Sequence, residues 1–323
     1  MKCLVTGGLG FIGSHLAQRL VELGHEVKVF DLTPSGWLNR EKAGGITYYR
    51  RSITEHALKN FRCDWVFHLA ALADVIPSVE NPMPYHRTNV DGTVNVLDHA
   101  LRLGVKRFIY ASSTSIYGIP VQYPTPETAP ADPMYPYALT KWVAEEYVSH
   151  WTRLYQLPAV SLRITTAYGP GMKSRGVYGS VFKVFLPQKA NGAPYTVVGD
   201  GSQSRDFIFV DDVVEAFVKA AGSKVTGIFN VGGGQPTTIQ RLIELLGPQN
   251  GVVHLPKRTG EPDMTWANIS KAERVLGWQP KVSIEEGVKI MLEHLDEWES
   301  DPVWTPETIE GATREWFRHL RPI

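Results

Sequence analysis

Apolar residues in the first 110 positions of the chain fall into two alternating patterns. Residues 11–23 and 85–103 carry apolar side chains at three- and four-residue spacing, which predicts amphipathic helices. Short runs rich in β-branched and aromatic residues predict strands at residues 2–6, 26–31, 46–49, 65–69 and 107–112. Because this alternation is typical of a parallel sheet covered by helices, we predict an α/β fold with a doubly wound parallel sheet.

The alternation loosens beyond residue 168. Up to that point, a helix is predicted at 137–155, with Pro136 suited to its first turn, and a strand at 159–165. Gly and Pro recur between residues 169 and 201, before a strand at 207–210, a helix from Asp211 and a strand at 227–231 resume the pattern. We therefore predict one domain of residues 1–168 and 206–232 and a smaller domain of residues 169–205 and 233–323. Residues 301–323 are interpreted as a docked helix with no assigned function.

The charge balance argues against several partners. Among 323 residues, 33 Lys and Arg balance 33 Asp and Glu, so no net field attracts nucleic acid or an anionic membrane. Cys3 and Cys63 lie in apolar runs outside any CxxC or Cys/His pattern, so no metal site is expected. No apolar stretch reaches the roughly 18 residues that a membrane-spanning helix needs. We expect a soluble cytoplasmic protein that binds no nucleic acid, no membrane and no metal.

The first predicted strand runs into a glycine-rich turn that opens the first helix. Gly7, Gly8, Gly10 and Gly13 satisfy both GxGxxG and GxxGxxG spacing. A Cβ at these positions would block the tight turn and the approach of a pyrophosphate, which the helix amino end then binds through its free N–H groups. The turn therefore predicts a dinucleotide site.

Asp31 indicates which dinucleotide is bound. It ends the second predicted strand, 18 residues after Gly13, where a carboxylate accepts hydrogen bonds from ribose hydroxyls and repels a 2′-phosphate. No Arg stands among Leu32, Thr33 and Pro34 to reverse that preference, so NAD is favoured over NADP. The alternative is a turn that only tightens packing, with Asp31 a solvated strand end.

Tyr137 and Lys141 lie four residues apart on one face of a predicted helix. A phenol becomes a base near neutral pH only where a cation favours the phenolate, and we expect Lys141 to be that cation. Such a base is what oxidation of a hydroxyl requires. The hydroxyl cluster Ser112, Ser113, Thr114 and Ser115 follows a predicted parallel strand, where ligands bind in sheets of this kind.

These segments together resemble the extended short-chain dehydrogenase/reductase family, in its branch of NAD-dependent nucleotide-sugar epimerases and dehydratases. The resemblance covers about residues 1–295 and rests on TGGLGFIGSHL (6–16), HLAA (68–71), NVDGT (89–93), SSTSIYG (112–118), YALTK (137–141) and RDFIFVDDV (205–213). It implies a Rossmann domain that binds NAD and a smaller domain that binds a nucleoside-diphosphate sugar. It also implies a homodimer through the helices near 85–103 and 137–155.

The resemblance assigns roles to individual residues. Tyr137 is the implied catalytic base, Lys141 its electrostatic partner and Ser113 the hydroxyl that binds the reacting oxygen. Arg205 and Arg258 match arginines that hold the substrate diphosphate or ribose. The implied NAD-binding residues are Gly7, Gly10, Phe11, Ile12, Gly13, Asp31, Leu32, Ile53, Leu69, Ala70, Ala71, Asn89, Tyr137 and Lys141. The implied substrate-binding residues are Ser78, Ser113, Thr114, Thr166, Arg205, Arg258 and Thr265.

Departures from the family pattern help to choose the reaction. Relatives that eliminate water or decarboxylate carry acids just after the catalytic Ser or Thr, where this chain has Thr114 and Ser115. We therefore favour epimerisation at C4 of a UDP-sugar over 4,6-dehydration or 4-keto reduction. A non-catalytic NAD-responsive binding protein is a third possibility. Thr265 stands where galactose-restricted relatives bear Tyr, which predicts room for a larger C2 or C5 substituent.

Overall fold

The computed structural model describes residues 1–32, 44–55, 61–172, 176–247 and 249–320. Thr33 and Pro34, where the absence of Arg favours NAD over NADP, lie outside the described residues, as do residues 321–323. Within the described residues, seven strands form one parallel sheet in the order β10-β6-β5-β4-β1-β2-β3. Their bounds are β1 (Lys2–Thr6), β2 (Glu26–Asp31), β3 (Ile46–Arg50), β4 (Trp65–His68), β5 (Arg107–Ser113), β6 (Ala159–Ile164) and β10 (Gly227–Val231).

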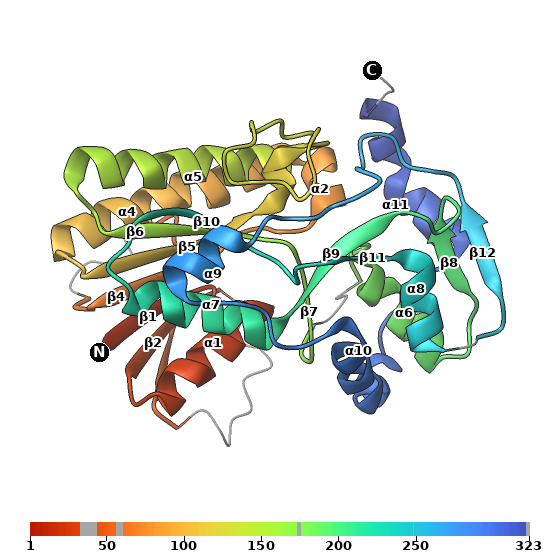
Figure 1. Cartoon of the computed structure of the whole chain (residues 1–323), viewed down its shortest axis with the longest axis horizontal. Coiled ribbons are helices and arrows are strands. Elements are labelled where there is room, and N and C mark those ends of the chain that lie inside the picture. Colours follow the sequence, from red (N-terminus) through yellow and green to blue (C-terminus); the bar gives the residue numbers. More distant parts are fainter. Residues whose placement is uncertain (33–43, 56–60, 173–175, 248, 321–323) are drawn as a thin grey trace.

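Helices cover both faces of this main sheet (Figure 1). One face carries α1 (Phe11–Glu22), α7 (Val210–Gly222) and α9 (Ser270–Leu276), and the other carries α4 (Gly92–Leu103) and α5 (Pro136–Tyr155). The apolar stripes of these helices are buried against the strands, as Leu16 and Phe217 are on the first face and Leu97 and Val148 on the second. The predicted doubly wound α/β fold is confirmed.

The helix predicted over residues 85–103 consists of three pieces. α3 (Pro82–Tyr85) is followed by the π-helical turn η1 (His86–Asp91) and then by α4. The Asn89 side chain is hydrogen-bonded to both backbone groups of Leu72, and the Thr93 hydroxyl donates to Asn89 O at 2.6 Å. These bonds fix the turn at a point where the amphipathic pattern alone predicts a continuous helix.

A second group of strands and helices lies beyond the carboxyl ends of the main strands (Figure 1). In the described chain it contains a three-stranded sheet, β11-β9-β7, and a two-stranded pair, β12-β8. These strands are β7 (Thr166–Tyr168), β8 (Tyr195–Val198), β9 (Ser204–Phe209), β11 (Pro236–Thr238) and β12 (Val252–Leu255). The helices around them are α2 (Val75–Glu80), α6 (Val181–Ala190), α8 (Ile239–Leu246), α10 (Ile284–Glu293), η3 (Leu295–Trp298) and α11 (Pro306–His319), and the short η2 (Thr114–Tyr117) follows β5.

The change of sheet occurs at Thr165, which differs from the predicted boundary at residue 168. Pairing of β6 with β10 ends at Ile164 opposite Val231, and the next pairing joins Thr166 to Phe207 on β9. Residues 206–209, which we predicted with the main sheet, thus belong to the three-stranded sheet, whereas α7 and β10 lie on the main one. Alternating apolar patterns do not reveal which sheet a strand joins, because both sheets bury their strands.

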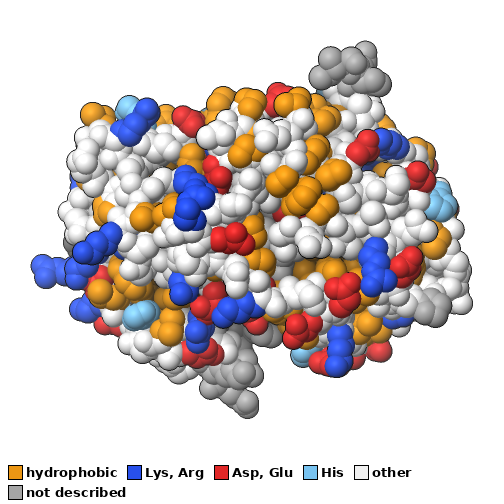
Figure 2. Space-filling model, viewed as in Figure 1, with side chains coloured by type: hydrophobic (Ala, Val, Ile, Leu, Met, Phe, Trp, Pro, Cys, Tyr) orange, Lys and Arg blue, Asp and Glu red, His pale blue; other side chains and the backbone are white. Residues whose placement is uncertain are grey.

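The surface carries charges of both signs. On the face in Figure 2, Lys and Arg side chains are interspersed with Asp and Glu. Across the described residues, no helix is long and apolar enough to cross a membrane. The same part of the chain holds no group of three His, Cys, Asp or Glu that could bind a metal ion.

Candidate active site

Close backbone contacts shape the glycine turn between β1 and α1. Gly7 has a φ of +69°, and a Cβ there would lie 2.6 Å from Ala70 N. A Cβ on Gly13 would lie 2.1 Å from the carbonyl oxygen of Gly7. α1 begins at Phe11 with Gly10 as its N-cap, and this fully described helix has neither a side-chain cap nor an acidic residue in its first turn. Its amino end therefore presents free N–H groups and a positive dipole at the turn.

These residues fit the two phosphates and the adenosine ribose of NAD. The turn sits at the carboxyl end of β1, where the strand order reverses between β2 and β4, which is the ligand-binding position in such sheets. Asp31 Oδ2 accepts a hydrogen bond from Leu9 N at 2.9 Å, so the carboxylate lies beside the turn. A Cβ at Gly7 or Gly13 would collide with backbone atoms of the turn or of the segment after β4, so this close backbone approach requires glycine at both positions.

The other predicted NAD-binding residues differ in how deeply they are buried. Leu32 is 57% exposed beside Asp31, whereas Ile53 is buried against Gly92. Leu69 and Ala70 continue β4 next to the turn, with Leu69 N donating to Thr6 O at 3.1 Å, and Ala71 follows them, partly buried. Asn89 is buried, and its side chain is hydrogen-bonded to the backbone of Leu72. These contacts favour a structural role for Asn89.

Tyr137 and Ser113 meet at the carboxyl end of β5. Tyr137 lies in the first turn of α5, where Pro136 occupies the position that its missing N–H suits. The Ser113 hydroxyl, at the end of β5, is hydrogen-bonded to the phenol and also accepts from Ser115 N at 3.2 Å. Burial raises the pKa of Tyr137 above its ordinary value, the bond from Ser113 opposes this, and Asp74 raises the pKa further.

Lys141 contacts β5 in this structure, and its action on the phenol stays a prediction. Its Nζ donates to Ala111 O and lies 4.4 Å from the centroid of the Tyr110 ring. Burial lowers the pKa of Lys141 to about 7, which Glu145 opposes. The one-turn spacing places both side chains on one helix face, but it does not determine which acceptor the flexible ammonium reaches.

Ser78 lies on α2 and is fully buried where this helix meets α5. Its hydroxyl donates to Val75 O at 2.6 Å and accepts from Tyr137 N at 3.2 Å. Ser78 therefore satisfies an amide at the start of α5 that has no acceptor within its own helix. This geometry favours a role in positioning Tyr137 over the substrate contact that the resemblance implies.

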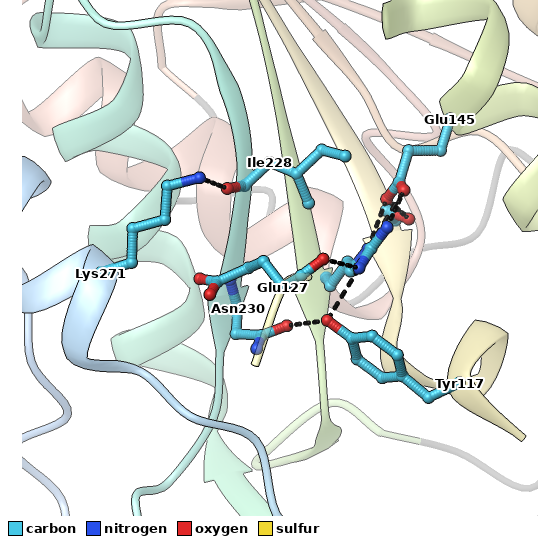
Figure 3. Close-up of polar contacts among 8 residues, drawn as sticks. Tyr117, Glu127, Glu145, Ile228, Asn230 and Lys271 are labelled. Carbon is cyan, nitrogen blue, oxygen red and sulfur yellow. Dashed lines mark hydrogen bonds and ion pairs between the residues drawn. The ribbon is translucent and has the colours of Figure 1, made fainter. Parts of the chain in front are cut away.

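A buried ionic network that the sequence analysis missed holds α5 on the sheet. Arg163 on β6 makes an ion pair with Glu145 at 2.6 Å, and Glu145 also accepts from the Ser112 hydroxyl at 2.6 Å. Arg163 Nη1 donates to the hydroxyl of Tyr117, which in turn donates to Asn230 Oδ1 at 2.8 Å (Figure 3). Glu145 is one turn beyond Lys141, so a helix-spaced Lys and Glu was the one local signal of this network.

Arg205 and Arg258 come together around Glu261, a residue to which the sequence assigns no role. Arg205 Nη2 lies 3.7 Å from one carboxylate oxygen of Glu261 and Arg258 Nε lies 3.2 Å from the other. The Arg258 guanidinium also lies over the Tyr178 ring, 5.2 Å from its centroid. Glu261 raises and Arg205 lowers the pKa of Tyr135, the N-cap residue of α5, so these two charges lie near the start of α5.

Thr114 and Thr265 line one small cavity beside the site. Its volume is about 20 Å³, which is room for about one water molecule, and its lining includes Thr165 and Trp266. Thr265 Oγ1 accepts from Asp206 N at 3.1 Å, so the backbone of β9 fixes its side chain. Thr166, on β7, is partly buried and is not among the lining residues.

The sheet, the glycine turn and the Ser–Tyr–Lys set define a dinucleotide-dependent enzyme acting on a hydroxyl group. Residues 3–232 match the model of the NAD dependent epimerase/dehydratase family. The chain belongs to this family, which confirms the resemblance stated above and NAD as the cofactor.

Relatives with assigned activities are similar over nearly the whole chain. A UDP-glucose 4-epimerase of Mycolicibacterium smegmatis is 36% identical, over 89% of this chain and 96% of its own. The crystal structure of a UDP-glucose 4-epimerase of Thermotoga maritima with UDP-glucose is similar with a TM-score of 0.86, at 36% identity, over 92% of this chain and 99% of its own. A UDP-glucuronic acid 4-epimerase of Bacillus cereus, in complex with UDP-glucuronic acid and NAD, gives 0.81 at 30% identity over 92% and 99%. UDP-glucuronic acid decarboxylases are also among the relatives.

Proposed function

We propose that this protein interconverts UDP-sugars that differ in configuration at C4. The observation that carries the proposal is the hydrogen-bonded pair Ser113 and Tyr137, at the end of β5, with no carboxylate at positions 114 and 115. The pair supplies a proton acceptor for a sugar hydroxyl, and the neighbouring glycine turn fits NAD. Relatives named as 4-epimerases support the same activity.

The residues of this chain have separate roles in the proposed reaction. Tyr137 takes the proton of the C4 hydroxyl and later returns it, while Ser113 holds the reacting oxygen by a hydrogen bond. NAD, held by the glycine turn and Asp31, would supply the hydride acceptor for oxidation at C4 and the hydride donor for the return. Arg205 and Arg258 bind the diphosphate through guanidinium groups suited to its oxygens, so the keto sugar turns about this linkage and stays in the site.

The alternative, elimination of water from the sugar, has one observation in its favour. Asp74 lies near enough to Tyr137 to raise the pKa of the phenol, so a carboxyl group is present at the site. However, Asp74 Oδ1 is 3.5 Å from Lys183 Nζ. The Asp74 carboxyl group is therefore engaged in an ion pair with Lys183. Epimerisation needs no carboxyl group as a general acid.

Thr265 supports a substrate with a large substituent on the sugar. Thr114 and Thr265 border a space that a bulky aromatic residue at 265 would occupy, and their hydroxyls are suited to polar groups. We assign the substrate class as UDP-sugars, and expect it to extend from UDP-glucose to sugars with an N-acetyl group at C2 or a carboxylate at C5.

A homodimer through α4 and α5 is the assembly we propose. The two helices pack against one another on the outer face of the sheet (Figure 1). α5 exposes Leu139, Tyr147, Leu154 and Tyr155, with exposed fractions of 45%, 37%, 57% and 46%. A second pair of the same helices would cover these apolar side chains.

A panel of nucleotide sugars tests the proposed function. The purified protein with NAD is incubated with UDP-, GDP-, CDP- and dTDP-sugars, and products are identified by NMR and mass. The proposal predicts a C4 epimer of equal mass from UDP-sugars and no net NADH. A product lighter by one water or one carbon dioxide contradicts it in favour of elimination or decarboxylation. An unchanged panel favours the binding protein.

A further inference from the structure

The carboxyl-terminal segment, residues 304–320, folds back on the candidate active site. Its helix α11 begins with a capping box between Thr305 and Thr308. Ile309, Thr313 and Trp316 form its buried face, with exposed fractions of 4%, 2% and 0%. The helix packs against α2, the helix whose Ser78 hydroxyl accepts from Tyr137 N (Figure 1). The segment lies outside the residues that match the family model.

Trp316 joins α11 to the segment that carries Arg258 and Glu261. Its indole Nε1 donates to Thr259 O at 2.9 Å. Its ring lies 5.5 Å from the Tyr135 ring, measured between centroids. One turn later, Leu320 packs on Gly260, at 3.6 Å from the position of a Cβ there. The contacts of Trp316 thus reach the residue after Arg258 and the residue two before Tyr137.

Trp304 supports the same arginine from another direction. The centroid of its ring lies 5.2 Å from that of Tyr178, and the Arg258 guanidinium lies over the same Tyr178 ring, 5.2 Å from the centroid. The Gln188 side chain donates to Trp304 O at 2.7 Å, which ties this end of the segment to α6. Arg258 is therefore held through Tyr178 as well as through Thr259.

We propose that the carboxyl-terminal segment holds residues 258–261 in the position that binds the substrate diphosphate, with Trp316 as a positioning residue. The inference rests on the proposed function, because it assigns the diphosphate to Arg205 and Arg258. Gly260 has a φ of +81°, a backbone conformation that favours glycine, and Leu320 packs on this turn of the loop. Fixing the loop before binding removes an ordering cost from the binding step.

Trp316→Phe tests this role, because it deletes the hydrogen bond to Thr259 and keeps an aromatic, though smaller, side chain at this position. Affinity for UDP is measured by calorimetry on the full-length protein loaded with NAD. We expect UDP to bind about five- to tenfold more weakly, the size of effect expected for one buried hydrogen bond. KM for the UDP-sugar should rise by a similar factor while kcat stays within about twofold, since the contact supports binding in ground and transition states alike.

Trp278→Phe is the matched control. Trp278 is 3% exposed and its Nε1 donates to Asp212 O at 2.9 Å, so the same substitution deletes an equivalent bond on α7. It should lower stability as much as Trp316→Phe and leave UDP affinity unchanged. Equal affinity in Trp316→Phe and wild type, or equal weakening in both variants, overturns the inference.

Two further outcomes distinguish failure of this inference from failure of the proposed function. If Trp316→Phe fails to fold, Leu320→Ala replaces it, and wild-type UDP affinity in that folded variant also overturns the inference. A wild-type protein that binds NAD but no UDP contradicts the proposed function itself, since the arginines then have no diphosphate to hold.

Discussion

Glu145 and Arg163 form an ion pair, 2.6 Å between Oε1 and Nη2, in which the glutamate side chain is fully buried and the arginine side chain is 6% exposed. The pair connects the catalytic helix α5 to strand β6. Glu145 also accepts a hydrogen bond from the Ser112 hydroxyl, and Arg163 donates one to the Tyr117 hydroxyl. Protein groups therefore stabilise both buried charges. A charge buried in this way depends strongly on its partner.

Glu145→Ala is therefore expected to destabilise the protein by about 3–5 kcal/mol, because it leaves the Arg163 guanidinium uncompensated in the interior. Unfolding in denaturant measures this loss. Glu146→Ala, at the exposed neighbouring position on the same helix, is the control and should change stability by less than about 0.5 kcal/mol. Similar values for the two variants would show that the ion pair contributes nothing to holding α5.

Tyr137→Phe should bind NAD with unchanged affinity and lose turnover by about 10²–10⁴-fold, the range typical of a general acid–base group. Steady-state assay with a UDP-sugar and a titration of NAD provide the two readings. Tyr155→Phe, 46% exposed at the far end of the same helix, serves as the control. Turnover by Tyr137→Phe at the rate of Tyr155→Phe would remove the phenol from the mechanism.

The pKa of Lys141 predicts a pH dependence of stability. Burial lowers the pKa to about 7 from 10.5, so between these values the unfolded chain binds a proton that the folded protein does not. Folding is then favoured as pH rises. The free energy of unfolding of the nucleotide-free wild type should increase relative to that of Lys141→Met between pH 7 and about 9. Lys289→Met, at an exposed position on α10, should show a constant difference from wild type. A constant difference for Lys141→Met too would refute the lowered pKa.

Thr265→Tyr tests the space beside the sugar. The aromatic side chain would fill the region bordered by Thr114, so turnover of UDP-N-acetylglucosamine should fall at least about tenfold relative to that of UDP-glucose. Parallel assays of the two substrates give the ratio. Thr128→Tyr, at an exposed position, should leave it unchanged. If the ratio in Thr265→Tyr equals that of the wild type, Thr265 does not select the substrate.

Local sequence predicts the glycine turn and the helix after it well, because their determinants are close in the chain. The glycines, the helix amino end and Asp31 lie within 25 residues, and each is required by a backbone geometry that few residue types allow. The catalytic helix is similarly marked by Pro136 and by the one-turn spacing of Tyr137 and Lys141. These elements lie where the sequence places them.

Long-range partners could not be predicted in the same way. Arg163 follows Glu145 by 18 residues, and Trp316 reaches Thr259 over 57. Neither spacing has a periodic signature, since the fold alone brings these residues together. The direction of the Lys141 ammonium and the sheet to which β9 belongs also depend on tertiary packing. Sequence thus indicates the chemistry of the site more readily than the contacts that hold it.

The central claim is reversible hydride removal at C4 of a UDP-sugar, and isotope retention tests it most directly. The protein with NAD is given UDP-glucose deuterated at C4 in ordinary water, and the product is examined by NMR. The account predicts UDP-galactose that retains the deuterium at C4, because the same hydride leaves and returns. Deuterium lost to solvent, or the absence of any C4 epimer from deuterated and unlabelled UDP-sugars alike, would contradict it.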